Sequence, residues 1–221
     1  MTQDATTGRM GRPARTSRDE ILRAARIVID RDGWQKLTIR ALGKELGVGA
    51  ATIYHHVRDR EDLLIQLLVE HAGRSIDVSL PEEPEARILA AAVAIRDTLA
   101  ALPWATEVLA TDGFLARLGG RAVQMVEAIV ATAIAAGASQ EDAVALFRNI
   151  WYLTVGEIQV RARTDSRPEA RDARASRFAD LDAEATPALA SIGEQWVAWA
   201  AHDTYADGVA SIIAGTLRRS G

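Results

Sequence analysis

The sequence predicts an all-α fold, and three observations carry that prediction. Alanine, which loses least on entering a helix, occupies 42 of the 221 positions. Apolar residues recur at three- and four-residue steps along most of the chain. No run of alternating β-branched residues bounded by hairpin turns is present. We expect an N-terminal three-helix domain followed by a larger helical domain.

The composition excludes several classes of protein. Cysteine is absent, so disulfides, thiolate metal sites and cysteine nucleophiles are excluded. The four histidines do not show metal-ligand spacing, and we expect neither a metal site nor a cofactor. The first twenty residues lack the apolar core of a secretory signal, and no stretch approaches the about 18 apolar residues of a membrane span. These features predict a cytoplasmic protein without a membrane partner.

The charge is unevenly distributed along the chain. The formal net charge is −4, yet residues 1–60 carry twelve basic and seven acidic side chains. The remainder of the chain is correspondingly acidic, with a net charge of −9. A basic front end on an acidic body suggests a polyanionic partner for the front end alone.

The front end begins with an expected mobile basic arm at residues 1–16, which is rich in Gly, Thr, Pro and Arg. Ser17 then begins a helix, because Glu20 three residues later completes a capping box. Gly33 is expected to end this helix. The apolar face of the helix comprises Ile21, Leu22, Ala25, Val28 and Ile29.

Two short helices follow, with a glycine turn between them. Thr38 caps a helix from Ile39 to Leu46, the turn is built on Gly47, and the next helix runs from about Gly49 to Val57. This pattern predicts a helix-turn-helix domain over residues 17–62. The alternative is a small three-helix core whose polar residues only cover the surface. The exposed side of the last helix would offer Thr52, Tyr54, His55 and His56 to DNA.

The run LTIRALGKELGVGAATIYHHVRDREDLLIQLL at residues 37–68 resembles the DNA-binding signature of the tetracycline-repressor (TetR) family. The resemblance implies that Thr38 caps its helix and contacts a phosphate, while Arg40 contacts a guanine edge. Gly49 would let the backbone approach DNA closely. Base-edge contacts would come from Ala50, Ala51 and Thr52, and backbone contacts from Tyr54, His56 and Arg60, with His55 near both. The arm would lie in a minor groove or remain a disordered tail.

Residues 63–221 are predicted to form the larger helical domain. We expect helices from Glu61 through His71, over 85–102, from Pro103 for a few residues, over 114–136, over 139–162, over Pro187–Ala201 and over Asp203–Arg219. A mobile charged connection is expected at 164–186. The 139–162 helix and the last helix, which carries Ala206, Ala210 and Ala214 at four-residue steps, are candidates for a dimer interface. Ordinary packing within the chain is the alternative.

The stretch from Leu102 to Val160 resembles the C-terminal domain of the tetracycline-repressor subgroup. The resemblance implies a homodimer formed through a four-helix bundle and a pocket for a small-molecule effector. The candidate pocket residues are Trp104, Phe114, Phe147 and Trp151, with Asn149 and Glu157 as polar groups. The alternative places the aromatic residues in the ordinary core and the polar pair in solvent.

The sequence therefore predicts a homodimeric, sequence-specific transcription regulator that binds a palindromic operator in double-stranded DNA. We expect a repressor that a small-molecule effector releases from its operator. An effector-independent DNA-binding module or constitutive repressor is the alternative. No Ser-His-Asp spacing, phosphate loop or dinucleotide fingerprint is present, so we do not expect an enzyme.

Overall fold

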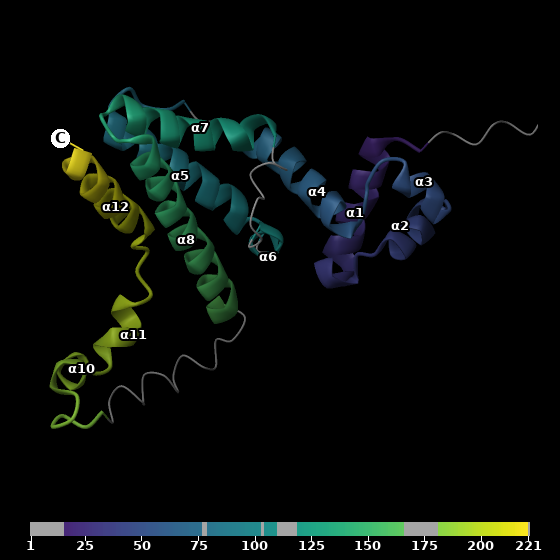
Figure 1. The fold of residues 1–221 in the computed structure, drawn as a ribbon. Helices are drawn as coiled ribbons and strands as arrows, with labels where there is room; N and C mark the ends of the chain where they lie inside the picture. The colour runs from purple at the N-terminus through teal and green to yellow at the C-terminus, as the bar shows by residue number, and fades with distance from the viewer. Residues whose placement is uncertain (1–15, 77–78, 103, 110–118, 166–180, 221) are drawn as a thin grey trace, which may run out of the picture. The chain divides into compact units, whose positions relative to one another are not determined.

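The computed structural model describes residues 16–76, 79–102, 104–109, 119–165 and 181–220 (Figure 1). Across these ranges every regular element is a helix, which confirms the predicted fold class. The chain divides into two compact units, Met1–Leu67 and Leu68–Gly221, and the division falls within helix α4 (Arg60–Ser75). The predicted basic arm lies outside the described residues apart from Thr16.

The N-terminal unit is built from short helices whose ends are fixed by local signals. The capping box is confirmed, because the Glu20 N–H donates to Ser17 Oγ at 3.2 Å and the Ser17 N–H donates to the Glu20 carboxylate at 2.8 Å. The first helix ends at Gly33, whose φ is +86°. The elements before α4 are α1 (Arg18–Asp32), the 3₁₀ turn η1 (Trp34–Lys36), α2 (Ile39–Leu46) and α3 (Ala50–Tyr54).

The core of this unit uses the predicted apolar positions. Every helix from α1 to α4 contributes at least one fully buried side chain. The helix predicted to reach Val57 ends at Tyr54 and is followed by a turn in which the His56 and Val57 N–H groups both donate to the Ile53 carbonyl. Val57 is nevertheless buried. The main core residues are Ile21, Leu22, Ala25, Val28, Leu37, Leu42, Ile53, Val57, Leu63 and Leu64.

The C-terminal unit is a helical body in which α5 packs against α7, α8 and α12, and α12 packs against α8 (Figure 1). In α8 the recurrence of apolar residues at three- and four-residue steps does mark a buried face, which comprises Ala143, Phe147, Ile150, Trp151, Thr154 and Ile158. The elements are α5 (Pro84–Ala100), α6 (Ala105–Leu109), α7 (Gly120–Ala135), α8 (Gln140–Asp165), α10 (Pro187–Ile192), α11 (Gln195–Trp199) and α12 (Tyr205–Ser220).

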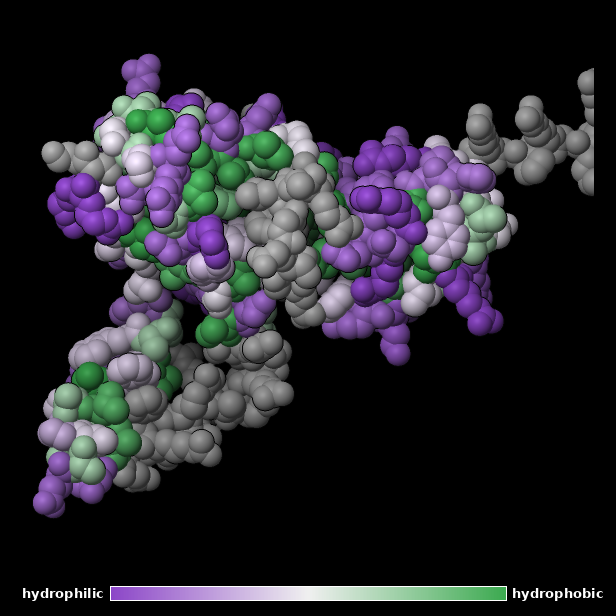
Figure 2. Space-filling view, in the orientation of Figure 1, coloured by the Kyte–Doolittle hydropathy of each residue, from purple (hydrophilic) through white to green (hydrophobic). Residues whose placement is uncertain are grey.

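The structure also differs from the prediction in the C-terminal unit. The expected helix Pro187–Ala201 is broken into α10 and α11 at Gly193, whose φ of +53° is incompatible with a right-handed helix. In the expected helix over 114–136, the apolar Ile134 is 41% exposed, whereas the neighbouring Ala133 is buried. Neither α10 nor α11 buries a residue, and Figure 2 shows hydrophobic residues at the surface of this segment.

Two predicted segments fall partly outside the described residues. The start of the expected helix at 114–136 lies in the range 110–118, and most of the expected charged connection lies in 166–180. In the described part of the chain, no helix combines the length and apolar character needed to cross a bilayer.

Candidate nucleic-acid interface and cavity of the body

Two glycines shape the turn between α2 and α3. Gly47 is left-handed, with φ +67° and ψ +27°, and its N–H donates to the Gly43 carbonyl. The Val48 N–H donates to the same carbonyl at 3.0 Å. A Cβ atom on Gly43 would lie 2.9 Å from the Val48 carbonyl oxygen, so any larger residue would push the turn away from α2. The turn therefore fixes the angle between the two helices.

The helix after the turn presents small and polar side chains to solvent. Gly49, Ala50, Ala51 and His55 are exposed, and the Tyr54 ring is 55% exposed. Thr52 and His56 are half-buried on the same helix and its C-terminal extension. A Cβ atom on Gly49 would meet nothing within 4 Å. Because Ile53 points into the core, the opposite side of α3 is open to a partner.

The beginning of α2 carries two further candidate DNA contacts. Thr38 Oγ1 accepts the Ala41 N–H at 3.0 Å, which confirms the predicted N-cap. The Thr38 and Arg40 side chains are both exposed. In the N-terminal unit, Figure 2 shows a mainly hydrophilic surface on the visible face.

Arg60 lies at the start of α4 and is occupied by contacts within the unit. Its Nε donates to the Leu37 carbonyl and its Nη2 to the Trp34 carbonyl, each at 2.7 Å. Its guanidinium carbon lies 5.0 Å from the centre of the Trp34 ring, which is a cation–π distance. The phosphate contact that the resemblance implies for Arg60 remains a prediction. Sequence reasoning missed these internal contacts.

A short helix with one buried side, a turn built on glycine and a second helix with one side exposed to solvent together define the helix-turn-helix class of DNA-binding proteins. The family model for bacterial regulatory proteins of the tetR family matches residues 21–67, which span this motif. Residues 21–67 are therefore similar to the DNA-binding domain of tetR-family regulators.

Individual relatives extend the similarity beyond the motif. An HTH-type transcriptional regulator of Saccharopolyspora erythraea is 29% identical over 212 residues, which cover 93% of this chain and 86% of that protein. The HTH-type regulator Rv0681 of Mycobacterium tuberculosis is 44% identical over 54 residues, and the match spans only 25% of its length. The Streptomyces coelicolor TetR family protein ActR, solved with actinorhodin, shares the fold at a TM-score of 0.79 and 21% identity, over 93% of this chain and 97% of ActR.

The body contains a small apolar cavity of about 40 Å³. Among the described residues that line it, only Thr98 has a hydroxyl group, which donates to the Ala94 carbonyl at 2.8 Å. The stacked rings of Phe147 and Trp151, with centroids 6.5 Å apart, form part of the wall. The other lining residues are Leu68, Ala72, Ile76, Ile95, Leu99, Ala122 and Val126.

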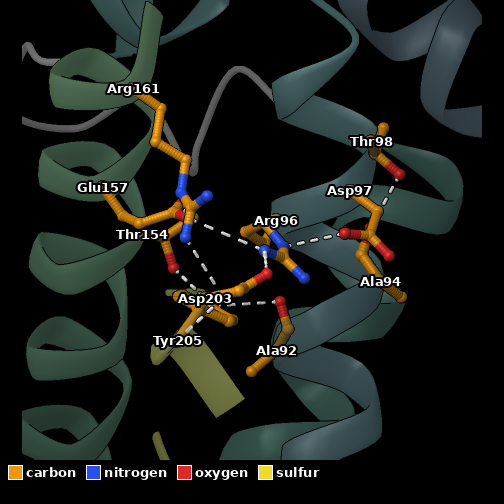
Figure 3. Close-up of polar contacts among 10 residues, drawn as sticks. All are labelled: Ala92, Ala94, Arg96, Asp97, Thr98, Thr154, Glu157, Arg161, Asp203 and Tyr205. Atoms are coloured by element: carbon orange, nitrogen blue, oxygen red, sulfur yellow. Dashed lines mark hydrogen bonds and ion pairs between the residues drawn. The ribbon is translucent and has the colours of Figure 1, made fainter. Parts of the chain in front are cut away.

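The residues predicted to line one pocket therefore do not all lie together. Phe147 and Trp151 line the cavity, whereas Trp104 is buried elsewhere in the body. Asn149 is exposed on α8, and Phe114 lies outside the described residues. Glu157 belongs to an ion cluster away from the cavity lining (Figure 3).

The ion cluster joins α5, α8 and the start of α12 (Figure 3). Arg96 forms ion pairs with Asp97 at 2.7 Å, with Asp203 at 3.0 Å and with Glu157 at 3.7 Å. Arg161 pairs with Glu157 and, at 3.4 Å, with Asp203. The hydrogen bond from Arg96 is the main reason that the pKa of Asp203 is lowered. Burial raises the pKa of the adjacent Tyr205 to about 12.

Proposed function

We propose that the chain is a homodimeric repressor that reads a palindromic operator in double-stranded DNA. The observation that carries the proposal is the open surface of α3, held on a rigid turn. The proposed contacts are Arg40 and the α3 side chains to base edges, and Thr38 with the residues around Tyr54 to phosphates. The full proposed set is Thr38, Arg40, Gly49, Ala50, Ala51, Thr52, Tyr54, His55 and His56.

A second copy is needed because a palindromic site has two equivalent halves. Support for a dimer comes from apolar residues that the body leaves exposed on α8, namely Val144, Tyr152 and Val160, at 52%, 57% and 65% exposure. On α12, Ala206 and Ala210 are exposed, while Gly208 faces α8, where a Cβ atom would lie 3.1 Å from Leu153. The α12 helix can therefore pack within the chain through one face and against a partner through another.

The proposed effector is a largely apolar small molecule that enters the cavity of the body. The described wall of the cavity is apolar apart from one hydroxyl group, which already donates a hydrogen bond. It therefore offers few hydrogen-bond or ion-pair partners to a charged ligand. Because the cavity is about 40 Å³, a drug-sized effector must move its walls. One wall is Leu68, Ala72 and Ile76 of α4, the helix whose Leu63 and Leu64 belong to the core of the N-terminal unit. Such a movement would reach the DNA-binding unit, and the regulator would act in the cytoplasm.

The small volume also favours the alternative of an effector-independent repressor. In a repressor released by an effector, the binding of DNA and the binding of the effector must be reciprocally coupled, whereas an effector-independent repressor has no such coupling. The test therefore screens apolar compounds for displacement of the protein from a duplex that it selects from random DNA. The affinity of any displacing compound is then measured with free protein and with protein saturated by that duplex.

We expect saturating DNA to lower the affinity of the protein for the compound by the same factor by which the compound lowers its affinity for DNA. Ala122→Phe, which fills the cavity, should abolish the response, and Ala131→Phe on the exposed face of α7 should preserve it. An unchanged compound affinity in the presence of DNA, or an intact response in Ala122→Phe, would favour the effector-independent alternative.

A further inference from the structure

We propose that Arg60 is a positioning residue for DNA recognition: it fixes the beginning of α2 and does not contact a phosphate. The proposal goes beyond the family resemblance, which implies a DNA backbone contact at this position. It rests on DNA binding by the chain and is independent of any effector.

The geometry commits the guanidinium to the protein. Nε and Nη2 form the side-on edge through which an arginine grips a phosphate with two parallel hydrogen bonds. In this structure that edge donates to the carbonyls of Leu37 and Trp34, each at 2.7 Å. One face of the group lies over the Trp34 ring at 5.0 Å. A phosphate contact through this side-on edge would require Arg60 to release both carbonyls.

The two carbonyls belong to the segment that sets the beginning of α2. Trp34 begins the η1 turn, and Leu37, which is completely buried, directly follows it. Thr38, the next residue, caps α2, and Arg40 lies in its first turn. Arg60 therefore joins this segment to α4 across 23 and 26 residues of sequence. Without Arg60, the positions of Thr38 and Arg40, the two proposed DNA contacts of α2, would no longer be fixed relative to α4.

Arg58 provides a natural comparison two residues away. Its side chain is 75% exposed and pairs with Asp62 at 3.4 Å, with its main-chain N–H donating to the same carboxylate at 2.9 Å. Removing the Arg58 charge changes the same region of the surface without touching the carbonyls of residues 34 and 37. A general charge effect would therefore appear in Arg58→Gln as well as in Arg60→Gln.

The first measurement is amide hydrogen exchange in the free protein, because it does not depend on any DNA sequence. In Arg60→Lys and Arg60→Gln, we expect the Ala41 and Leu42 amides of α2 to exchange at least about tenfold faster, since two charge-assisted hydrogen bonds are lost. The Ala25 amide in α1 should be unaffected, and Arg58→Gln should change none of the three. Unchanged α2 amides, or an equal increase at Ala25, would overturn the positioning role.

The second measurement is the salt dependence of binding to a duplex recovered by the unaltered protein from random DNA. Lysine keeps the charge but cannot donate to two fixed carbonyls as the planar guanidinium does. We therefore expect Arg60→Lys and Arg60→Gln to lose about tenfold in affinity at every salt concentration, with the salt slope unchanged.

A phosphate contact gives the opposite pattern: Arg60→Lys would keep its affinity, and Arg60→Gln would lose it with a slope shallower by about 0.9. That pattern, or full affinity in both variants, would overturn the proposal. If the unaltered protein recovers no preferred duplex, sequence-specific recognition itself fails, and the exchange measurement still decides the role of Arg60.

Discussion

The hydroxyl oxygens of Tyr205 and Thr154 lie 2.7 Å apart in the interior of the C-terminal unit. The Tyr205 hydroxyl also lies 3.2 Å from the Ala92 carbonyl, and Thr154 Oγ1 lies 2.7 Å from the Ile150 carbonyl. Tyr205 is only 2% exposed, and Thr154 is completely buried. This group of hydrogen bonds joins the first turn of α12 to both α5 and α8 (Figure 3). The α12 helix is also one of the two helices proposed for the dimer interface.

Tyr205→Phe should lower the free energy of unfolding by about 1–2 kcal/mol, because it leaves the buried Thr154 hydroxyl with one partner fewer. Thr154→Val should have a similar effect, and the double variant should lose less than the sum, since the pair shares one hydrogen bond. Urea denaturation measures all three. Tyr54→Phe, at a 55% exposed tyrosine on α3, is the matched control and should change stability little. Full stability of Tyr205→Phe would contradict the role of the hydroxyl group.

Acid should weaken the ion cluster through Asp203. Its pKa is lowered in the folded chain, chiefly by the hydrogen bond from Arg96, so folding favours the carboxylate. The resulting stability is present above the unfolded pKa of about 3.9 and is lost as the pH falls through the lower folded value. Asp203→Asn should remove this part of the acid dependence below about pH 4, whereas Asp207→Asn, exposed in the first turn of α12, should retain it. Denaturation curves from pH 2 to 6 that are identical for Asp203→Asn and the unaltered protein would refute the assignment.

Two nearby glycines should respond differently to alanine. Gly47→Ala should destabilise the N-terminal unit by about 1 kcal/mol, because alanine does not readily adopt φ +67°. Gly49→Ala should leave stability unchanged, since its φ is −72° and the space beside it is open. It should nevertheless weaken DNA binding, because a methyl group would hold the backbone away from the duplex. Thermal denaturation and duplex titration separate the two effects, and unimpaired DNA binding by Gly49→Ala would argue against a close approach at this position.

The exposed small residues of α12 provide a test of the dimer. Ala210→Asp places a charge on the proposed interface and should raise the dimer dissociation constant at least about tenfold, because a buried unpaired charge is costly. Ala131→Asp, at an exposed position on α7, should leave assembly unchanged. Sedimentation equilibrium measures both variants. A dimer of normal strength in Ala210→Asp would exclude this face of α12 from the interface.

The parts of the fold predicted from sequence are those set by neighbouring residues. Ser17 with Glu20, Thr38 and Gly47 fix helix ends through contacts over three or four positions, and these were readable without a structure. Gly193 was missed because a glycine within an apolar helical pattern costs only about 1 kcal/mol and does not by itself require a break.

The parts that could not be predicted depend on contacts between distant segments. Arg60 reaches carbonyls 23 and 26 residues away, and Arg96 reaches Asp203 across 107 residues. A single arginine in a helical pattern gives no local sign of such a partner. The same reason explains why Phe147 and Trp151 reach the cavity while Trp104 does not, since all three are large aromatic residues in apolar surroundings.

The most direct test of the central claim is selection of the purified protein against random duplex DNA at two salt concentrations. A dimer with two open α3 helices should recover a two-fold symmetric sequence whose half-sites lie about one helical turn or a multiple apart. The preference should persist at the higher salt, because base contacts supplement the phosphate contacts that salt weakens. Recovery of no preferred sequence, with binding that disappears as salt increases, would contradict sequence-specific recognition and leave only attraction between a basic surface and phosphates.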